Sequence, residues 1–301
     1  MEWPRLVGPL EHLPMPPSLA LWFDEVQRRC AGCGTLESAL LGGRLAATPG
    51  LAFLAGYQAA LRGLWASAPA GIGAFCATEQ GSLRPAEMGT RLVGGRLNGT
   101  KDYVTAGPAA SWLLVAARGE SERETPRLRL CLVDSLATGV TIELGPPLPL
   151  IPDIPHGRLR LVDVHAEPLA GDGWDGYVKP FRTLEDLHVF AALVSWLQGI
   201  GLACQWPQSL LLRLLGLMPA AAEVARLAPA APATHLLLAG LLAQFETLQP
   251  ELDAAFAGGP SHWADLWRRD RRVLDLARSA QARRRARASE AVGWPATAPP
   301  V

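Results

Sequence analysis

The stretch that decides the fold is Leu97–Asn98–Gly99–Thr100–Lys101–Asp102–Tyr103–Val104–Thr105. Asn and Gly tolerate the positive φ angles of a type I′ turn, so Asn98–Gly99 between two apolar runs predicts a β-hairpin. Short runs of the same kind, each bounded by Gly, Pro, Asn or Asp, continue on both sides. They predict strands at Ala74–Thr78, Arg91–Val93, Gly95–Leu97, Tyr103–Thr105, Trp112–Ala117, Arg127–Val133, Val140–Leu144 and Arg158–Val162. Strands so short and so evenly spaced are typical of an antiparallel barrel or sandwich.

The flanking sequence has a helical period instead. Apolar residues recur every three or four positions from Ser18 to Leu64, with a break near Thr48–Gly50, whereas residues 1–17 are proline-broken and predict an extended lead-in. After Gly176 the helical period returns. It predicts helices at Thr183–Cys204, Pro207–Leu217, Ala220–Leu227, Thr234–Ala257 and His262–Ser289.

These patterns predict an α+β protein in which a β-module lies between two helical segments. The expected parts are an N-terminal helical region (1–70), a central β-domain (71–177) and a C-terminal helical domain (178–292). The Pro- and Ala-rich end, residues 293–301, predicts a disordered tail.

Composition excludes several classes of function. The 301 residues carry a formal net charge of zero, which argues against a nucleic-acid partner. No basic, apolar signal opens the chain, and no uninterrupted apolar run has the length of about 18 residues that a membrane span needs. We therefore expect a cytoplasmic protein with no membrane partner, whose five cysteines are reduced thiols.

The cysteine, histidine and serine motifs of the sequence do not predict a catalytic or metal site. Cys30 and Cys33 form a lone CxxC with no second ligand pair, the histidines lack metal-ligand spacing, and no serine-hydrolase elbow occurs, so no metal site is expected. The last predicted helix is rich in arginine. It is interpreted either as a solvated surface helix paired with Asp265, Asp270 and Asp275, or as an anion-binding face for an acyl carrier protein or a coenzyme A phosphate.

Three pieces of residues 71–177 occur in the same order as in the acyl-CoA dehydrogenase family. Cys76–Ala77–Thr78–Glu79–Gln80–Gly81–Ser82 resembles the family's Thr-Glu-Pro-Gly-x-Gly-Ser-Asp loop, and residues 97–105 resemble its Leu-Asn-Gly-Thr-Lys-x-Trp-Ile-Thr segment. The run from Leu159 to Leu169, with Gly171, Gly173 and Gly176–Tyr177 after it, resembles the family's closing strand and the turn into its C-terminal helices. The whole chain is thus similar to a shortened acyl-CoA dehydrogenase.

This resemblance implies a flavoprotein that binds FAD and oxidises an acyl-CoA or acyl-carrier-protein thioester at its α,β bond. The cofactor-binding residues that it implies are Thr78, Gly81, Ser82, Tyr103, Val104 and Thr105. Tyr103 stands where the family has an aromatic residue that packs on the flavin ring, so it retains a stacking face. The resemblance also implies a homodimer or a heteromer with a related subunit.

The departures from the family bear on catalysis. The Asp after Gly81–Ser82 is missing, and so are the Arg-x-x-x-Gly and Gln-x-x-Gly-Gly runs of the C-terminal helices. The reaction needs a carboxylate to remove the α-proton, and Glu185 and Asp186 match the position that some relatives use. Their alternative role is to stabilise the first turn of a helix capped by Thr183. The alternative function is accordingly a catalytically inactive homologue that acts as a binding or partner subunit.

Overall fold

The computed structural model describes residues 3–8, 12–121 and 124–294. Its contacts divide the chain into two compact units, each built from separated segments. One, which we call the helical unit, comprises residues 1–14, 30–60 and 183–301, and the other, the β-unit, comprises residues 15–29 and 61–182. Helices α4 (Pro49–Leu64) and α5 (Lys179–Ala203) contribute residues to both units. The predicted tail lies almost wholly outside the described residues.

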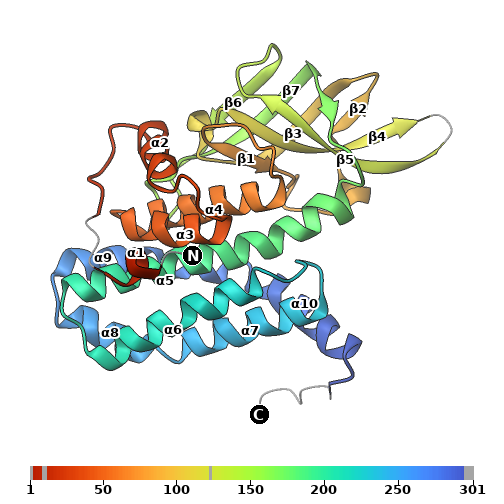
Figure 1. The fold of residues 1–301 in the computed structure, drawn as a ribbon. Helices are drawn as coiled ribbons and strands as arrows, with labels where there is room; N and C mark the ends of the chain where they lie inside the picture. Colours follow the sequence, from red (N-terminus) through yellow and green to blue (C-terminus); the bar gives the residue numbers. More distant parts are fainter. Residues whose placement is uncertain (1–2, 9–11, 122–123, 295–301) are drawn as a thin grey trace. The chain divides into compact units, whose positions relative to one another are not determined.

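The β-unit is built on one mixed sheet (Figure 1), in the strand order β6-β7-β3-β2-β4-β5-β8 with β1 paired to β4. Its strands are β1 (Gly73–Cys76), β2 (Arg91–Val93), β3 (Arg96–Thr105), β4 (Trp112–Ser121), β5 (Glu124–Asp134), β6 (Val140–Leu144), β7 (His156–His165) and β8 (Glu167–Pro168). Each predicted strand overlaps a strand of the structure, but the runs predicted at Gly95–Leu97 and Tyr103–Thr105 belong to the single strand β3. The prediction of a purely antiparallel sheet is wrong, because β1 and β2 both pair with β4 in parallel. The described pairings do not close the sheet into a barrel.

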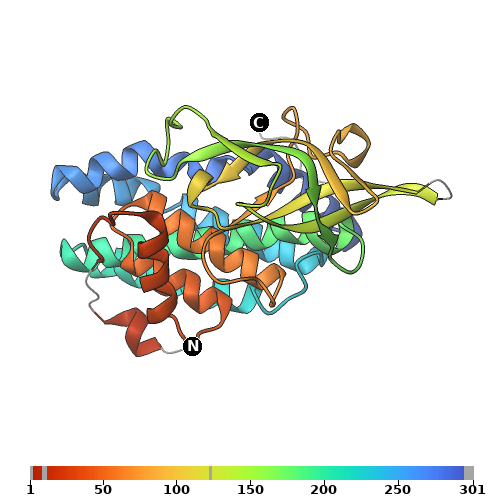
Figure 2. The ribbon, with the colours of Figure 1, turned by 90° about the horizontal axis from the view of Figure 1, so that it is seen from above.

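The longest pairing in this sheet joins β4 and β5, which lie side by side in Figures 1 and 2. Both faces of this pairing are buried: Leu113 and Val115 lie on one face of β4, and Leu130, which pairs with Ala116, lies on the other. Helix α2 (Leu19–Arg29) and the short helical segments η1 (Pro85–Glu87), η2 (Gly107–Ala109) and η3 (Trp174–Val178) complete the β-unit.

The hairpin predicted at Asn98–Gly99 is wrong, and the structure gives both residues another role. The turn that joins β2 to β3 is Gly94–Gly95, whose φ angles of 55° and 76° fit a type I′ turn. Asn98 and Gly99 lie within β3, opposite an irregularity in β7. There Asp163 has a φ of 52°, and its backbone N–H donates to Asn98 Oδ1 at 2.9 Å. The Asn side chain thus stabilises a β-bulge rather than a turn.

The helical unit contains most of the helices. They are α1 (Trp3–Val7), α3 (Thr35–Leu45), most of α4 and α5, α6 (Gln208–Val224), α7 (Pro232–Glu246), α8 (Gln249–Ala257), α9 (Ser261–Asp270), η4 (Arg271–Asp275) and α10 (Arg278–Ala291). Several predicted boundaries need correction. Residues 3–7 are helical rather than extended, α6 continues through Pro219, and the two long helices predicted after residue 233 are each divided.

Helix α5 is apolar enough to pass a length and composition test for a membrane span. The candidate segment, Trp174–Ala203, has a mean hydropathy of 1.3, but 89% of its window is buried inside the protein. Trp196, for example, is fully buried and stacks on Trp267 of α9 with ring centroids 6.2 Å apart. Such burial is typical of a core helix, which is how we interpret α5.

The close approach of α3 to α5 yields the first testable prediction. A Cβ added at Gly43 would lie 2.1 Å from the backbone oxygen of Ala192. Backbone cannot move aside as a side chain does, so Gly43→Ala is expected to lower the free energy of unfolding by about 1–3 kcal/mol or more. Urea unfolding measures this. The control is Gly240→Ala in α7, where nothing lies within 4 Å of the added Cβ. Helix propensity alone should raise its stability by about 1 kcal/mol, and two changes of the same sign and size would contradict the packing argument.

Candidate functional site

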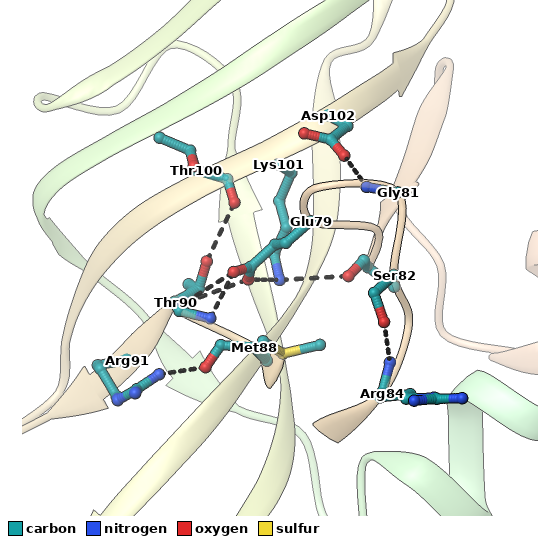
Figure 3. A network of polar contacts seen from close by, with 12 residues as sticks. Glu79, Gly81, Ser82, Arg84, Met88, Thr90, Arg91, Thr100, Lys101 and Asp102 are labelled. Atoms are coloured by element: carbon teal, nitrogen blue, oxygen red, sulfur yellow. Dashed lines mark hydrogen bonds and ion pairs between the residues drawn. The ribbon is translucent and has the colours of Figure 1, made fainter. Parts of the chain in front are cut away.

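A buried ion pair lies at the centre of the segment that carries the resemblance. The side chain of Lys101 on β3 is fully buried, and its Nζ donates to Glu79 Oε1 at 2.6 Å (Figure 3). Glu79 follows β1, and its side chain is 9% exposed. Charges this deep are costly unless each has a partner, so the pair fixes the loop after β1 to the middle of β3.

Backbone groups complete the surroundings of the Glu79 carboxylate. The N–H groups of Gly89 and Thr90 both donate to it, the latter at 3.1 Å to Oε1, and Thr90 Oγ1 donates to the backbone oxygen of Thr100 at 3.3 Å. Burial alone would raise the pKa of Glu79, but Lys101 and these N–H donors outweigh it and lower that pKa. Burial lowers the pKa of Lys101, against the opposing effect of Glu79. Residues 79–90 are thereby tied to β3 at both ends of the loop.

The loop begins with a tight turn that uses its own backbone donors. Gln80 and Gly81 have φ angles of 47° and 73°, and Glu79 and Ser82 exchange backbone hydrogen bonds of 2.9 and 2.8 Å. The N–H of Gly81 donates to Asp102 Oδ2 at 2.8 Å, as Figure 3 shows. The predicted cofactor-binding residues Gly81 and Ser82 therefore direct their N–H groups into the protein, and a phosphate could reach those groups only by replacing these bonds.

The predicted flavin-facing strand is only partly open to solvent. Tyr103 is 53% exposed, Thr105 is 8% exposed and the side chain of Val104 is fully buried, so Val104 could contribute only its backbone. The N–H of Asp102 donates to the backbone oxygen of Thr78 at 2.9 Å. Thr78, Gly81 and Tyr103 are thus brought together around Asp102. A shallow pocket here is lined by Gln80, Thr100, Asp102, Tyr103 and Arg158.

The two candidate bases lie deeper in α5 than predicted. The helix begins at Lys179, so Thr183 is not its N-cap and Glu185 and Asp186 are not in its first turn. Stabilisation of the first turn is therefore not their role. Asp186 is 6% exposed and forms an ion pair with Arg284 of α10, within the helical unit. Glu185 is half-buried.

Sequence reasoning missed Glu79, Lys101 and Asp102 as organising residues. All three lie inside the segments that carry the resemblance, and Lys101 is one of only two lysines in the chain. A lysine in an alternating strand, at a position whose side chain faces the core, was the available signal, because a buried lysine nearly always has a partner.

The structure also places the cysteine and arginine motifs noted in the sequence. Burial raises the pKa of the Cys30 thiol to about 12, which disfavours its reactive thiolate form. The pairing predicted for the arginine-rich segment is confirmed, since Arg268 binds Asp265, Arg269 binds Asp270 and Arg278 binds Asp275.

Comparison with known proteins supports the fold. No protein-family description and no curated protein matches the sequence, but solved structures do. The chain aligns with "PigA with FAD and proline" at a TM-score of 0.65 and 15% identity, over 91% of this chain and 89% of that one. It aligns with butyryl-CoA dehydrogenase from Megasphaera elsdenii at a TM-score of 0.62 and 14% identity, over 89% of this chain and 86% of that one. The alignment with the prolyl acyl carrier protein oxidase AnaB has a TM-score of 0.63 and 17% identity, over 88% of this chain and 85% of that one.

These likenesses establish structural similarity to members of the acyl-CoA dehydrogenase family at low sequence identity. The chain has their α+β arrangement of N-terminal helices, a β-sheet and C-terminal helices.

Proposed function

We propose that this protein is a cytoplasmic FAD-dependent flavoprotein that oxidises an acyl-CoA or acyl-carrier-protein thioester at its α,β bond. The observation that carries the proposal is Tyr103, a half-exposed aromatic ring on β3 that shares a pocket with Asp102, in a fold shared with flavin-binding dehydrogenases. Two of the similar proteins are named for coenzyme A and acyl-carrier-protein compounds. In line with the family resemblance, we further propose a homodimer or a heteromer with a related subunit.

The residues fit one part of the cofactor better than the other. Tyr103 offers a flat face for an isoalloxazine ring, and the polar residues Gln80, Thr100, Asp102 and Arg158 line the same pocket. Gly81 and Ser82 fit the pyrophosphate poorly, because their N–H groups already donate within the protein. A bound flavin would supply the acceptor for the hydride that leaves the substrate's Cβ. The protein would contribute the carboxylate that removes the α-proton.

The hydrogen bonds within the turn at residues 79–82 favour one alternative function. The N–H groups of Gly81 and Ser82 donate to Asp102 and Glu79, so they are not available to the FAD pyrophosphate. FAD affinity would then be weak, as expected of an inactive homologue that serves as a binding or partner subunit.

A visible absorption spectrum separates the two functions. The purified protein is expected to show the band of oxidised flavin, or to acquire it with added FAD, and the band should bleach when an acyl-CoA is added. Protein that stays colourless after incubation with FAD and gel filtration would exclude the flavoprotein. A flavin band that no acyl thioester bleaches would favour the inactive homologue.

The stacking role of Tyr103 has its own test. Tyr103→Ala should weaken FAD binding roughly tenfold or more, because aromatic stacking on a planar heterocycle contributes about 1–3 kcal/mol. Flavin fluorescence titration measures the affinity. The matched control is Val162→Ala, an equally exposed apolar residue on β7 (50%) outside the pocket, which should leave the affinity unchanged. Equal affinities of the Tyr103 variant and the parent would remove this residue from the site.

A further inference from the structure

A groove in the helical unit, apart from the proposed flavin site, lies among α7, α8, η4 and α10. It encloses about 660 Å³, within the range of about 300–1,000 Å³ that is usual for small-molecule sites. Its apolar part is formed by Leu238, Leu242 and Leu274. Helices α7 and α10 lie side by side along it (Figure 1).

Arginines surround this apolar part. Five of them line the groove: Arg271, Arg272, Arg278, Arg284 and Arg285. The acidic residues of the groove are already engaged, because Asp253 binds Arg271 at 2.8 Å, and Glu246 and Asp275 bind Arg278 at 2.9 and 2.7 Å. Among the described residues, Arg272 and Arg285 have no ion-pair partner. The groove therefore holds an excess of positive charge.

Arg284 adds an unsatisfied donor. Its Nη2 donates to Asp186, which holds the guanidinium in place, whereas its Nη1 is buried and has no hydrogen-bond partner among the described residues. Buried N–H groups without an acceptor are rare in native proteins. His235 also lines the groove, and burial together with the charge of Arg284 lowers its pKa. An anionic group in the groove would complete this arrangement.

We propose that this groove binds a small amphipathic anion, with an alkyl chain on the leucines and a carboxylate or phosphate head group against Arg272, Arg284 and Arg285. The site is additional to the proposed flavin site and does not depend on it. Guanidinium groups suit both head groups, since each presents oxygen acceptors that the N–H donors match in geometry. The leucine surface distinguishes such a ligand from a free inorganic ion.

The test is a calorimetric titration of the purified full chain with dodecanoate, dodecyl phosphate and dodecanol, all below micelle-forming concentrations. At least one of the two anions is expected to bind at one site per chain, at least tenfold more tightly than the alcohol. The double variant Arg272→Gln/Arg285→Gln should weaken that binding at least tenfold. The control, Arg283→Gln/Arg287→Gln, removes the same charge from exposed positions of α10 outside the groove and should change affinity less than twofold.

Preference for one head group would identify the source of the anion as a carboxylate or a phosphate ester. No saturable binding, equal binding of the alcohol, or the same loss in both double variants would overturn the proposal. Because no flavin takes part in the titration, a colourless protein that binds dodecanoate would sink the proposed function and leave this inference standing.

Discussion

Replacing Lys101 by methionine is expected to lower the free energy of unfolding by about 3–5 kcal/mol, because the change leaves the Glu79 carboxylate buried without its countercharge. Methionine fills much of the same volume, so the loss reports the charge rather than a cavity. The N–H donors of Gly89 and Thr90 remain, but they do not neutralise the carboxylate. Chemical denaturation followed by tryptophan fluorescence measures the effect.

A double variant separates the ion pair from its surroundings. Glu79→Gln/Lys101→Met removes both charges and should recover a large part of the stability that the lysine change alone removes. The exposed pair Arg84–Glu87, with side chains 79% and 50% exposed, is the matched control, and its disruption should have little measurable effect. The argument fails if the single and double variants are equally unstable, since the loss would then come from packing and not from an unpaired charge.

Replacing Glu185 by glutamine is expected to slow flavin reduction by an acyl thioester about 10²–10⁴-fold, the usual contribution of a general base. Of the two candidates in α5 we favour Glu185, because the side chain of Asp186 is almost fully buried, whereas that of Glu185 is only half-buried. Stopped-flow bleaching of the flavin band measures the rate. Glutamine keeps the size of the side chain, so flavin content should be nearly unchanged.

The neighbouring position provides the comparison. Asp186→Asn breaks the ion pair with Arg284 and should appear as lost stability in unfolding experiments. If instead this variant loses activity with its stability intact, while Glu185→Gln keeps its rate, the base is Asp186. If both variants keep their rates, neither residue is the base. These tests depend on the proposed function and apply once flavin reduction is observed.

Local sequence was sufficient to predict most of the β-unit. The runs Arg91–Val93 and Val140–Leu144 were predicted with the bounds that β2 and β6 have in the structure. In β7, Leu159 and Leu161 are buried while Arg158 and Arg160 are exposed, as the alternation of these residues along the sequence implies. Both results follow because strand bounds and faces depend on residues that are neighbours in sequence.

The prediction failed where a distant segment decides the conformation. Asn98–Gly99 has the residues of a type I′ turn, yet the bulge in β7 engages Asn98 and the chain turns at Gly94–Gly95 instead. The predicted helix start at Thr183 was wrong for a related reason. Threonine is a favoured N-cap residue, which is why the helix was predicted to begin there. In the structure, residues 174–178 already form a helical turn that leads into α5 at Lys179.

The sequence by itself determined the order of helices and strands, the resemblance of the segments that follow β1 and form β3 to the acyl-CoA dehydrogenase family, and the aromatic residue at position 103. Only the tertiary structure showed that Glu79 and Lys101, 22 positions apart, form a buried pair, and that Asp186 binds Arg284, 98 positions away. It also showed that the N–H groups of Gly81 and Ser82 are engaged. The physical reason is that periodicity and turn chemistry act over a few residues, whereas partners for buried charges and backbone donors come from whichever segment the fold brings within about 3 Å.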